Sequence, residues 1–157
     1  MRWFNLNLPV PADNARKTWD TTTDPRTLVS AVFSMVAPIE TEIFASGLGR
    51  LTGVTEPLAE ALAATDFTGY RLAPATTEPT EFPNDYGLDP STLVFPRVYA
   101  LQITGQPGVD DFAKTYTFVL SERITDFLCA RDPTLSSKYR RREVDISGGP
   151  VRGTISE

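Results

Sequence analysis

The sequence has no histidine and only one cysteine, Cys129, among its 157 residues. Without histidine the chain lacks the usual general base at neutral pH, every catalytic triad built on imidazole, and the commonest zinc and iron ligand. A single thiol permits neither an internal disulfide nor a thiolate zinc site. A P-loop, an EF-hand loop and a Gly-x-Ser-x-Gly motif are absent as well. We therefore expect a protein that is not an enzyme and that needs no metal and no cofactor.

The chain also lacks a long hydrophobic run. Its longest apolar stretch, 28–39, is interrupted by two serines and a proline and falls short of the roughly 18 residues of a membrane helix. Near the start, Asn5, Asn7 and Pro9 break the apolar stretch too soon for a signal peptide. Together with the single cysteine, these features predict a cytoplasmic protein.

Basic residues are outnumbered, 15 against 20 acidic ones, which gives a net charge of −5. Phosphate binding needs clustered lysine and arginine, so nucleic acid is an unfavourable partner. A basic protein surface is a favourable one. The one basic run, 138–142, leads into Glu143, Val144 and Ile146, which predicts an edge strand whose charges oppose sheet-to-sheet association.

The spacing of apolar residues and the turn signals between them predict strands at 1–8, 39–44, 93–104 and 116–120, and the beginning of a further strand within 66–72. The polar segment 12–27 is predicted to be a loop. For 28–37 two alternatives stay open. Asp24 and Pro25 suit the start of a helix, whereas the β-branched and aromatic residues that follow suit a buried strand.

Two helices have clear starts. Thr55 is a suitable N-cap with a glutamate and a proline in the first turn after it, and Ser121 caps a second helix. The stretches 51–62 and 117–128 share an apolar strand end, a hydroxyl N-cap, a first-turn glutamate and apolar residues at helical spacing. Either the fold contains two similar strand–helix units, or the match is what any strand–helix junction looks like.

These elements predict an α+β fold in a single domain over 1–147, with a mixed, mainly antiparallel sheet and two or three helices. The segment 73–90 is rich in proline, threonine and acids, and it is predicted to be a long irregular surface loop. The remaining residues, 148–157, are predicted to form a flexible tail.

Acidic and aromatic residues gather in the loops that flank the predicted strand 93–104. If these loops meet, they form an acidic patch suited to a basic protein, in which two aromatic side chains would act as anchors. Otherwise the long loop is simply a solvated, mobile segment. The candidate partner-binding residues are Glu78, Glu81, Phe82, Asp85, Tyr86, Asp89, Asp110 and Asp111.

Two adjacent carboxylates, Asp110 and Asp111, allow a second interpretation. Such a pair could hold a metal ion or perform acid–base chemistry. More often it caps a short helix, here 111–114, and lies in water. The capping interpretation is the favoured one, so no catalytic and no metal-binding residue is assigned.

The stretch 96–128 resembles bacterial toxin-immunity proteins, specifically the Imm11-like group and the related double-CXXCG proteins. The resemblance lies in the segment 96–101, in the glycines before Asp110-Asp111-Phe112, and above all in 118–123 (Phe-Val-Leu-Ser-Glu-Arg) leading into a short amphipathic helix. The cysteine pairs that name the double-CXXCG proteins are absent, so no metal function is carried over.

This resemblance implies an antitoxin that binds and occludes a cognate bacterial toxin. An acidic inhibitor of a basic toxin would gain association rate and specificity from complementary charge. A different possibility is a non-enzymatic structural or accessory component of a phage or secretion particle. The neighbouring genes separate the two, because an immunity gene follows a toxin gene directly whereas a particle component lies among tail or sheath genes.

Overall fold

The computed structural model describes residues 1–48, 50–89 and 92–146, and the predicted tail 148–157 lies outside this part of the chain. The chain divides into two compact units. We call residues 9–64 and 72–102 the barrel unit, and residues 1–8, 65–71 and the described residues from 103 onward the helix–sheet unit. Each is considered by itself.

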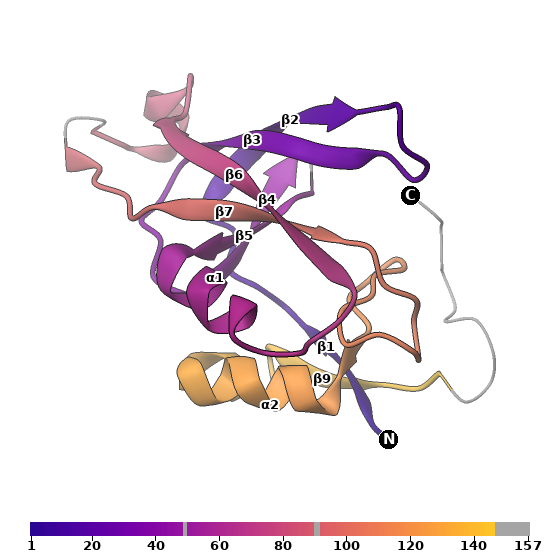
Figure 1. Ribbon diagram of the computed structural model, residues 1–157. Helices are drawn as coiled ribbons and strands as arrows, with labels where there is room; N and C mark the ends of the chain where they lie inside the picture. The colour runs from indigo at the N-terminus through magenta and orange to yellow at the C-terminus, as the bar shows by residue number, and fades with distance from the viewer. Residues whose placement is uncertain (49, 90–91, 147–157) are drawn as a thin grey trace. The chain divides into compact units, whose positions relative to one another are not determined.

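The barrel unit is built on a closed six-stranded barrel with the strand order β2-β3-β6-β7-β5-β4 (Figure 1). The pairs β2–β4 and β3–β6 are parallel, whereas β2–β3, β4–β5 and β5–β7 are antiparallel. The strands are β2 (Ala12–Asp20), β3 (Thr27–Met35), β4 (Ile43–Leu48), β5 (Thr52–Thr55), β6 (Tyr70–Pro79) and β7 (Val98–Ile103).

Aromatic packing fills the barrel. Phe33 and Phe44 are completely buried, and their rings meet edge to face with centroids 5.2 Å apart. Gly53 on β5 lies directly under these rings, because a Cβ atom there would stand 2.3 Å from the Phe44 ring. Any side chain at this position would displace the ring, so the interior is a packed core.

Helix α1 (Glu56–Ala63) follows β5 without a break. Thr55 takes the extended N-cap conformation and Pro57 lies in the first turn, as predicted. The Thr55 hydroxyl makes no capping hydrogen bond, and it is buried without a partner among the described residues. The helix buries Leu58 and Leu62, one turn apart on the same face.

The helix–sheet unit contains an antiparallel three-stranded sheet in the order β8-β1-β9. Its strands are β1 (Trp3–Leu6), β8 (Leu120–Ser121) and β9 (Arg141–Val144), and its helix is α2 (Glu122–Arg131). Ser121 caps α2 as predicted, because its hydroxyl accepts the Ile124 N–H at 3.2 Å. The basic segment forms the edge strand β9, also as predicted. Two 3-10 helices complete the described elements, η1 (Pro83–Tyr86) in the barrel unit and η3 (Pro133–Ser136) here.

The predicted α+β class is confirmed, since the described residues form mixed, mainly antiparallel sheets and two α-helices. Both stretches with matching patterns fold as a strand that runs directly into a helix, one in each unit. The open alternative at 28–37 is resolved as strand β3. Neither helix among the described residues is long and apolar enough to cross a membrane.

The predicted loop 12–27 is wrong for its first part, because Ala12–Asp20 is strand β2. Two irregularities, between Ala12 and Asn14 and between Thr18 and Trp19, shift the register against β3. They interrupt the two-residue alternation that would have revealed the strand in the sequence. Only residues 21–26, between β2 and β3, lie outside strands as predicted.

The predicted loop 73–90 is also wrong at its start, since β6 continues to Pro79. Proline has no N–H to donate in a sheet. Pro79 needs none to pair with β3, because Met35, which lies opposite it, accepts its hydrogen bond from the Thr80 N–H. Three further boundaries differ from the predictions. Residues 39–42, 93–97 and 116–119 precede their strands, which start at Ile43, Val98 and Leu120.

Candidate functional site

The residues predicted to bind a partner fall into two groups, and the larger one lies in the barrel unit. We call residues 80–89 the acidic loop. Thr80 anchors its beginning, because its N–H donates to Met35 O at 3.0 Å and its hydroxyl donates to Asp13 Oδ2 at 2.9 Å. The same hydroxyl accepts the Phe82 N–H at 3.2 Å. Thr80 is only 4% exposed, so the loop leaves the barrel from a fixed point.

The tip of the acidic loop is ordered by its own backbone. Asp85 N–H donates to Phe82 O at 3.1 Å, and Leu88 N–H donates to Pro83 O at 2.9 Å. Gly87 follows η1 with φ of 66°, a left-handed conformation that glycine adopts without strain. The loop therefore presents its side chains from a defined turn.

Two aromatic side chains project from this turn. Phe82 is 60% exposed and Tyr86 is 49% exposed, although large apolar side chains are normally buried. Glu81, Asp85 and Asp89 around them are also exposed. The arrangement combines apolar contact area with negative charge, which are the features of a surface that binds a basic protein.

Glu78 lies just before the acidic loop, on β6, and it differs from the loop acids. Its carboxylate pairs with Arg16 of β2 at 2.6 Å. The hydrogen bond and the charge of Glu78 raise the pKa of the Arg16 guanidinium above its ordinary value. Glu78 therefore contributes less free negative charge than its position in the sequence indicated.

The second group, Asp110 and Asp111, lies in the helix–sheet unit. The Asp110 carboxylate accepts the Gln106 N–H at 2.7 Å and so closes a turn. Asp111 is 6% exposed and points into its own unit. The short helix predicted for 111–114 is wrong, because Ala113 instead forms an isolated bridge with Gly105.

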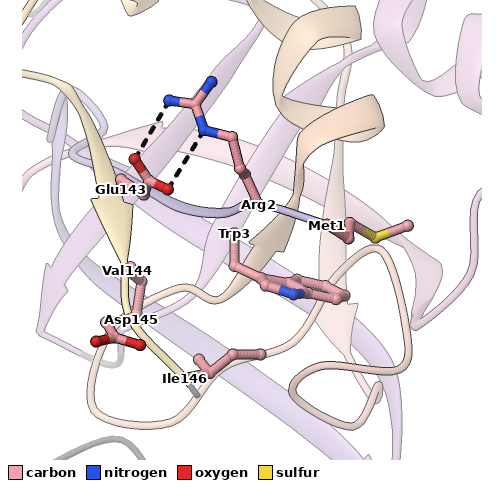
Figure 2. A pocket seen from close by; sticks show the side chains of 7 residues that line it. All are labelled: Met1, Arg2, Trp3, Glu143, Val144, Asp145 and Ile146. Carbon is pink, nitrogen blue, oxygen red and sulfur yellow. Dashed lines mark hydrogen bonds and ion pairs between the residues drawn. The ribbon is translucent and has the colours of Figure 1, made fainter. Parts of the chain in front are cut away.

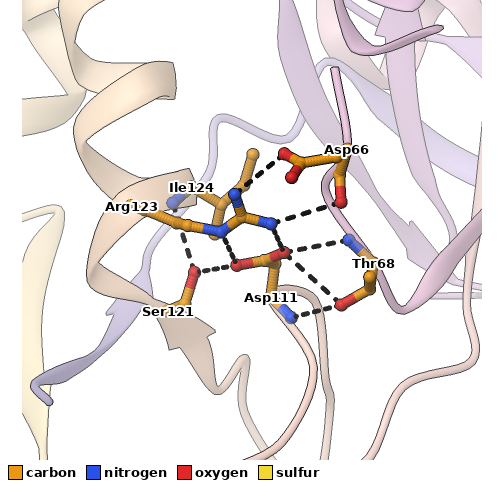
Figure 3. Close-up of polar contacts among 6 residues, drawn as sticks. All are labelled: Asp66, Thr68, Asp111, Ser121, Arg123 and Ile124. Atoms are coloured by element: carbon orange, nitrogen blue, oxygen red, sulfur yellow. Dashed lines mark hydrogen bonds and ion pairs between the residues drawn. The ribbon is translucent and has the colours of Figure 1, made fainter.

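Asp111 is the centre of a polar cluster that joins three separate stretches of the chain (Figure 3). Arg123 binds both carboxylate oxygens, with Nε 2.7 Å from Oδ1 and Nη2 2.6 Å from Oδ2. Ser121 Oγ donates to Oδ1 at 2.6 Å and Thr68 N–H donates to Oδ2 at 2.9 Å. Arg123 also binds the Asp66 carboxylate at 2.9 Å. We call these five residues the Asp111 cluster.

The hydrogen bonds of the Asp111 cluster outweigh the effect of burial. Burial by itself would raise the pKa of the Asp111 carboxyl, but donors from Arg123, Ser121 and Thr68 hold that pKa below its ordinary value. The Ser121 hydroxyl donates its proton to Asp111 and accepts the N–H of Ile124, so it is fully used. The cluster therefore holds the unit together and presents no free nucleophile.

A shallow pocket of about 380 Å³ lies beside β1 and β9 (Figure 2). The Trp3 indole and Ile146 form its apolar side. Arg2 and Glu143 lie at its edge, where Arg2 Nη2 stands 3.2 Å from Glu143 Oε2. Because these two charges bind each other and Trp3 is only 7% exposed, the pocket offers little free charge and little aromatic surface.

Sequence reasoning missed the residues that fix both groups. Thr68 lies 43 residues before Asp111, and Asp13 lies 67 residues before Thr80. Ser121 and Arg123 lie only 10 and 12 residues after Asp111, but no local pattern indicates that they bind it. Among the described residues no group of three Asp, Glu or Cys side chains is placed to hold a metal ion. Comparison of the chain with protein-family models, with curated proteins and with solved structures gave no match.

Proposed function

We propose that the protein is a non-enzymatic binding protein of the immunity type, which occludes a basic bacterial toxin in the cytoplasm through the acidic loop. The observation that carries the proposal is the exposure of Phe82 and Tyr86, 60% and 49%, on an anchored turn rich in carboxylates. Aromatic side chains are enriched at protein interfaces, and tyrosine is among the residues that most often contribute a large share of the binding energy.

The order of the loop supports this role. A loop that is already held in place by hydrogen bonds at Thr80 and within η1 loses less conformational entropy when it binds. The carboxylates of Glu81 and Asp85 would attract a basic partner over several ångströms and so raise the association rate. The resemblance of 96–128 to immunity proteins favours a toxin as this partner.

Co-expression with the product of the gene directly upstream tests the proposal. We expect the two proteins to co-purify, and we expect cells that carry the upstream gene to grow only when this chain is present. Failure of both co-purification and growth rescue would reject the toxin as partner. A location of the gene among tail or sheath genes would instead favour a particle component.

Charge reversal tests the acidic loop itself. In the purified complex, the double substitution Glu81→Lys and Asp85→Lys should lower the association rate and weaken its dependence on ionic strength. Glu40→Lys with Glu60→Lys is the matched control, because both are exposed acids of the same unit outside the acidic loop and the net charge changes by the same amount. An association rate that responds equally to both changes would show that net charge, and not the loop, matters.

A further inference from the structure

A second surface of the barrel unit has a different chemistry. An open groove of about 370 Å³ lies between residues 74–77 of β6 and residues 95–99, which lead into β7. This volume is within the range of pockets that bind small ligands, so the groove suits a short piece of extended chain. Figure 1 shows the two strands that border it.

The backbone of β6 points into this groove. In the parallel pairing of β3 with β6, Met35 lies opposite Pro79, and Thr80 N–H donates to Met35 O. Alternate residues of a strand in such a ladder direct both backbone groups to the same neighbour. Glu78 therefore bonds to β3, whereas Thr77 directs its N–H and C=O away from β3, to the side where the groove lies. Pro79, which has no N–H, occupies an equivalent outward position.

The strand that would pair with Thr77 is interrupted. β7 begins only at Val98, and Pro96 before it carries no N–H. Among the described residues, no backbone hydrogen bond joins Thr77 to 95–97. The barrel is closed where β6 pairs with β7. At Thr77, beyond that pairing, the edge of β6 that faces away from β3 remains available for another strand.

The opposite wall of the groove is fixed and carries a cation. Arg97 O accepts the Glu56 N–H at 3.0 Å, which attaches this wall to the start of α1. The Arg97 guanidinium is 81% exposed, and its Nε lies 3.4 Å from the Glu56 carboxylate. A surface ion pair of this kind contributes little free energy, so an acidic ligand can replace Glu56 as the partner of Arg97. Phe95 and Tyr99 are partly buried and supply apolar surface.

We propose that this groove binds a short extended peptide segment of a partner protein by strand addition to β6. The peptide backbone would pair with the outward N–H and C=O of Thr77. An apolar side chain would contact Phe95 and Tyr99, and an acidic side chain would face Arg97. The groove is separate from the acidic loop, because the groove would bind an acidic peptide whereas the loop would bind a basic partner. The proposal for the groove does not depend on the immunity function.

Selection of a random-peptide phage library on the purified protein tests the proposal. We expect the enriched sequences to share an acidic residue next to an apolar one. A labelled synthetic peptide of that sequence should then bind in a fluorescence anisotropy titration. Thr77→Pro should weaken binding about tenfold, because it removes the outward N–H without removing a bond to β3. Thr77→Val, which keeps the N–H, should bind like the wild type.

Three further measurements complete the test. Arg97→Ala should reduce affinity for the acidic peptide but not for a version in which glutamine replaces the acid. Tyr116→Ala, which alters an exposed side chain of the other unit without changing charge, should leave the affinity unchanged. If Thr77→Pro does not fold, peptides methylated on single backbone nitrogens replace it, and loss of binding should alternate along the peptide. Enrichment of no acidic sequence, equal binding by the Pro and Val variants, or insensitivity to every N-methyl group would overturn the proposal.

Discussion

Asp111 and Asp85 are the same kind of residue in opposite situations. Asp111 is buried in the helix–sheet unit and receives hydrogen bonds from an arginine, a serine and a threonine. Asp85 is exposed on the acidic loop of the barrel unit, where its backbone shapes the turn and its carboxylate faces water. The difference shows that acids which look alike in the sequence can be buried among hydrogen-bond donors at one position and exposed on a surface loop at another.

The largest expected effect is a loss of stability when Asp111, the buried member of this pair, is replaced. Asp111→Asn should lower the free energy of unfolding by about 3 kcal/mol, because the amide cannot accept two charged hydrogen bonds and leaves Arg123 without its main partner. Asp85→Asn should change it by less than about 0.5 kcal/mol. Urea unfolding of both variants measures the difference. Similar losses for the two would show that the cluster does not stabilise the unit.

The acidic loop should show the opposite behaviour, in which a substitution lowers affinity for the partner but leaves stability unchanged. Phe82→Ala should weaken the complex by about 2 kcal/mol, roughly 30-fold, while leaving the stability of the free protein unchanged. Tyr116→Ala is a suitable control, because Tyr116 is 57% exposed but belongs to the other unit. Isothermal titration with the co-purified partner gives both affinities. Loss at Tyr116 without loss at Phe82 would move the binding surface to the helix–sheet unit.

The two strand–helix junctions allow a sharper comparison of buried hydroxyls. Ser121→Ala should cost about 1 kcal/mol of stability, because Ser121 caps α2 and also donates to Asp111. Thr55→Ala should cost less, since the Thr55 hydroxyl is buried without a partner among the described residues. Thermal unfolding of the two variants shows which substitution costs more stability. A larger loss of stability for Thr55→Ala would contradict the structural assignment of the two caps.

The smallest expected effect is a change in acid sensitivity. The folded-state pKa of Asp111 lies below its ordinary value, so its stabilising contribution is present above the unfolded pKa of about 3.9 and is lost as pH falls toward the folded pKa. Stability measured from pH 6 to pH 3 should therefore fall less steeply for Asp111→Asn than for the wild type. Parallel curves would indicate that other carboxylates dominate the acid limb.

The sequence predicted those parts of the fold that depend on local signals. The starts of α1 and α2, the first strand and the edge strand β9 follow from caps and alternation within a few residues. β2 could not be recognised, because its register shifts interrupt the alternation. The end of β6 was hidden by Pro79, and only the direction of its backbone relative to β3 explains why a proline is tolerated there.

The candidate site divides in the same way. The exposure of Phe82 and Tyr86 agrees with the prediction of a surface loop, since proline, asparagine and glycine around them are local turn signals. The burial of Asp111 could not be predicted, because it depends on Arg123 and Thr68, which approach only after the chain has folded. That the two groups of acids form one partner-binding patch stays a prediction.

The placement of β1 has a consequence for synthesis on the ribosome. β1 is synthesised well before its partners, because Trp3 pairs with Ser121 and Val144, which lie 118 and 141 residues further along the chain. Trp3, Phe4 and Leu6, all buried in the finished fold, therefore lack these partner strands until β8 and β9 have been translated. During that interval the nascent chain exposes an apolar segment that is prone to aggregation. Chaperone binding and inclusion-body formation should therefore depend on these few residues.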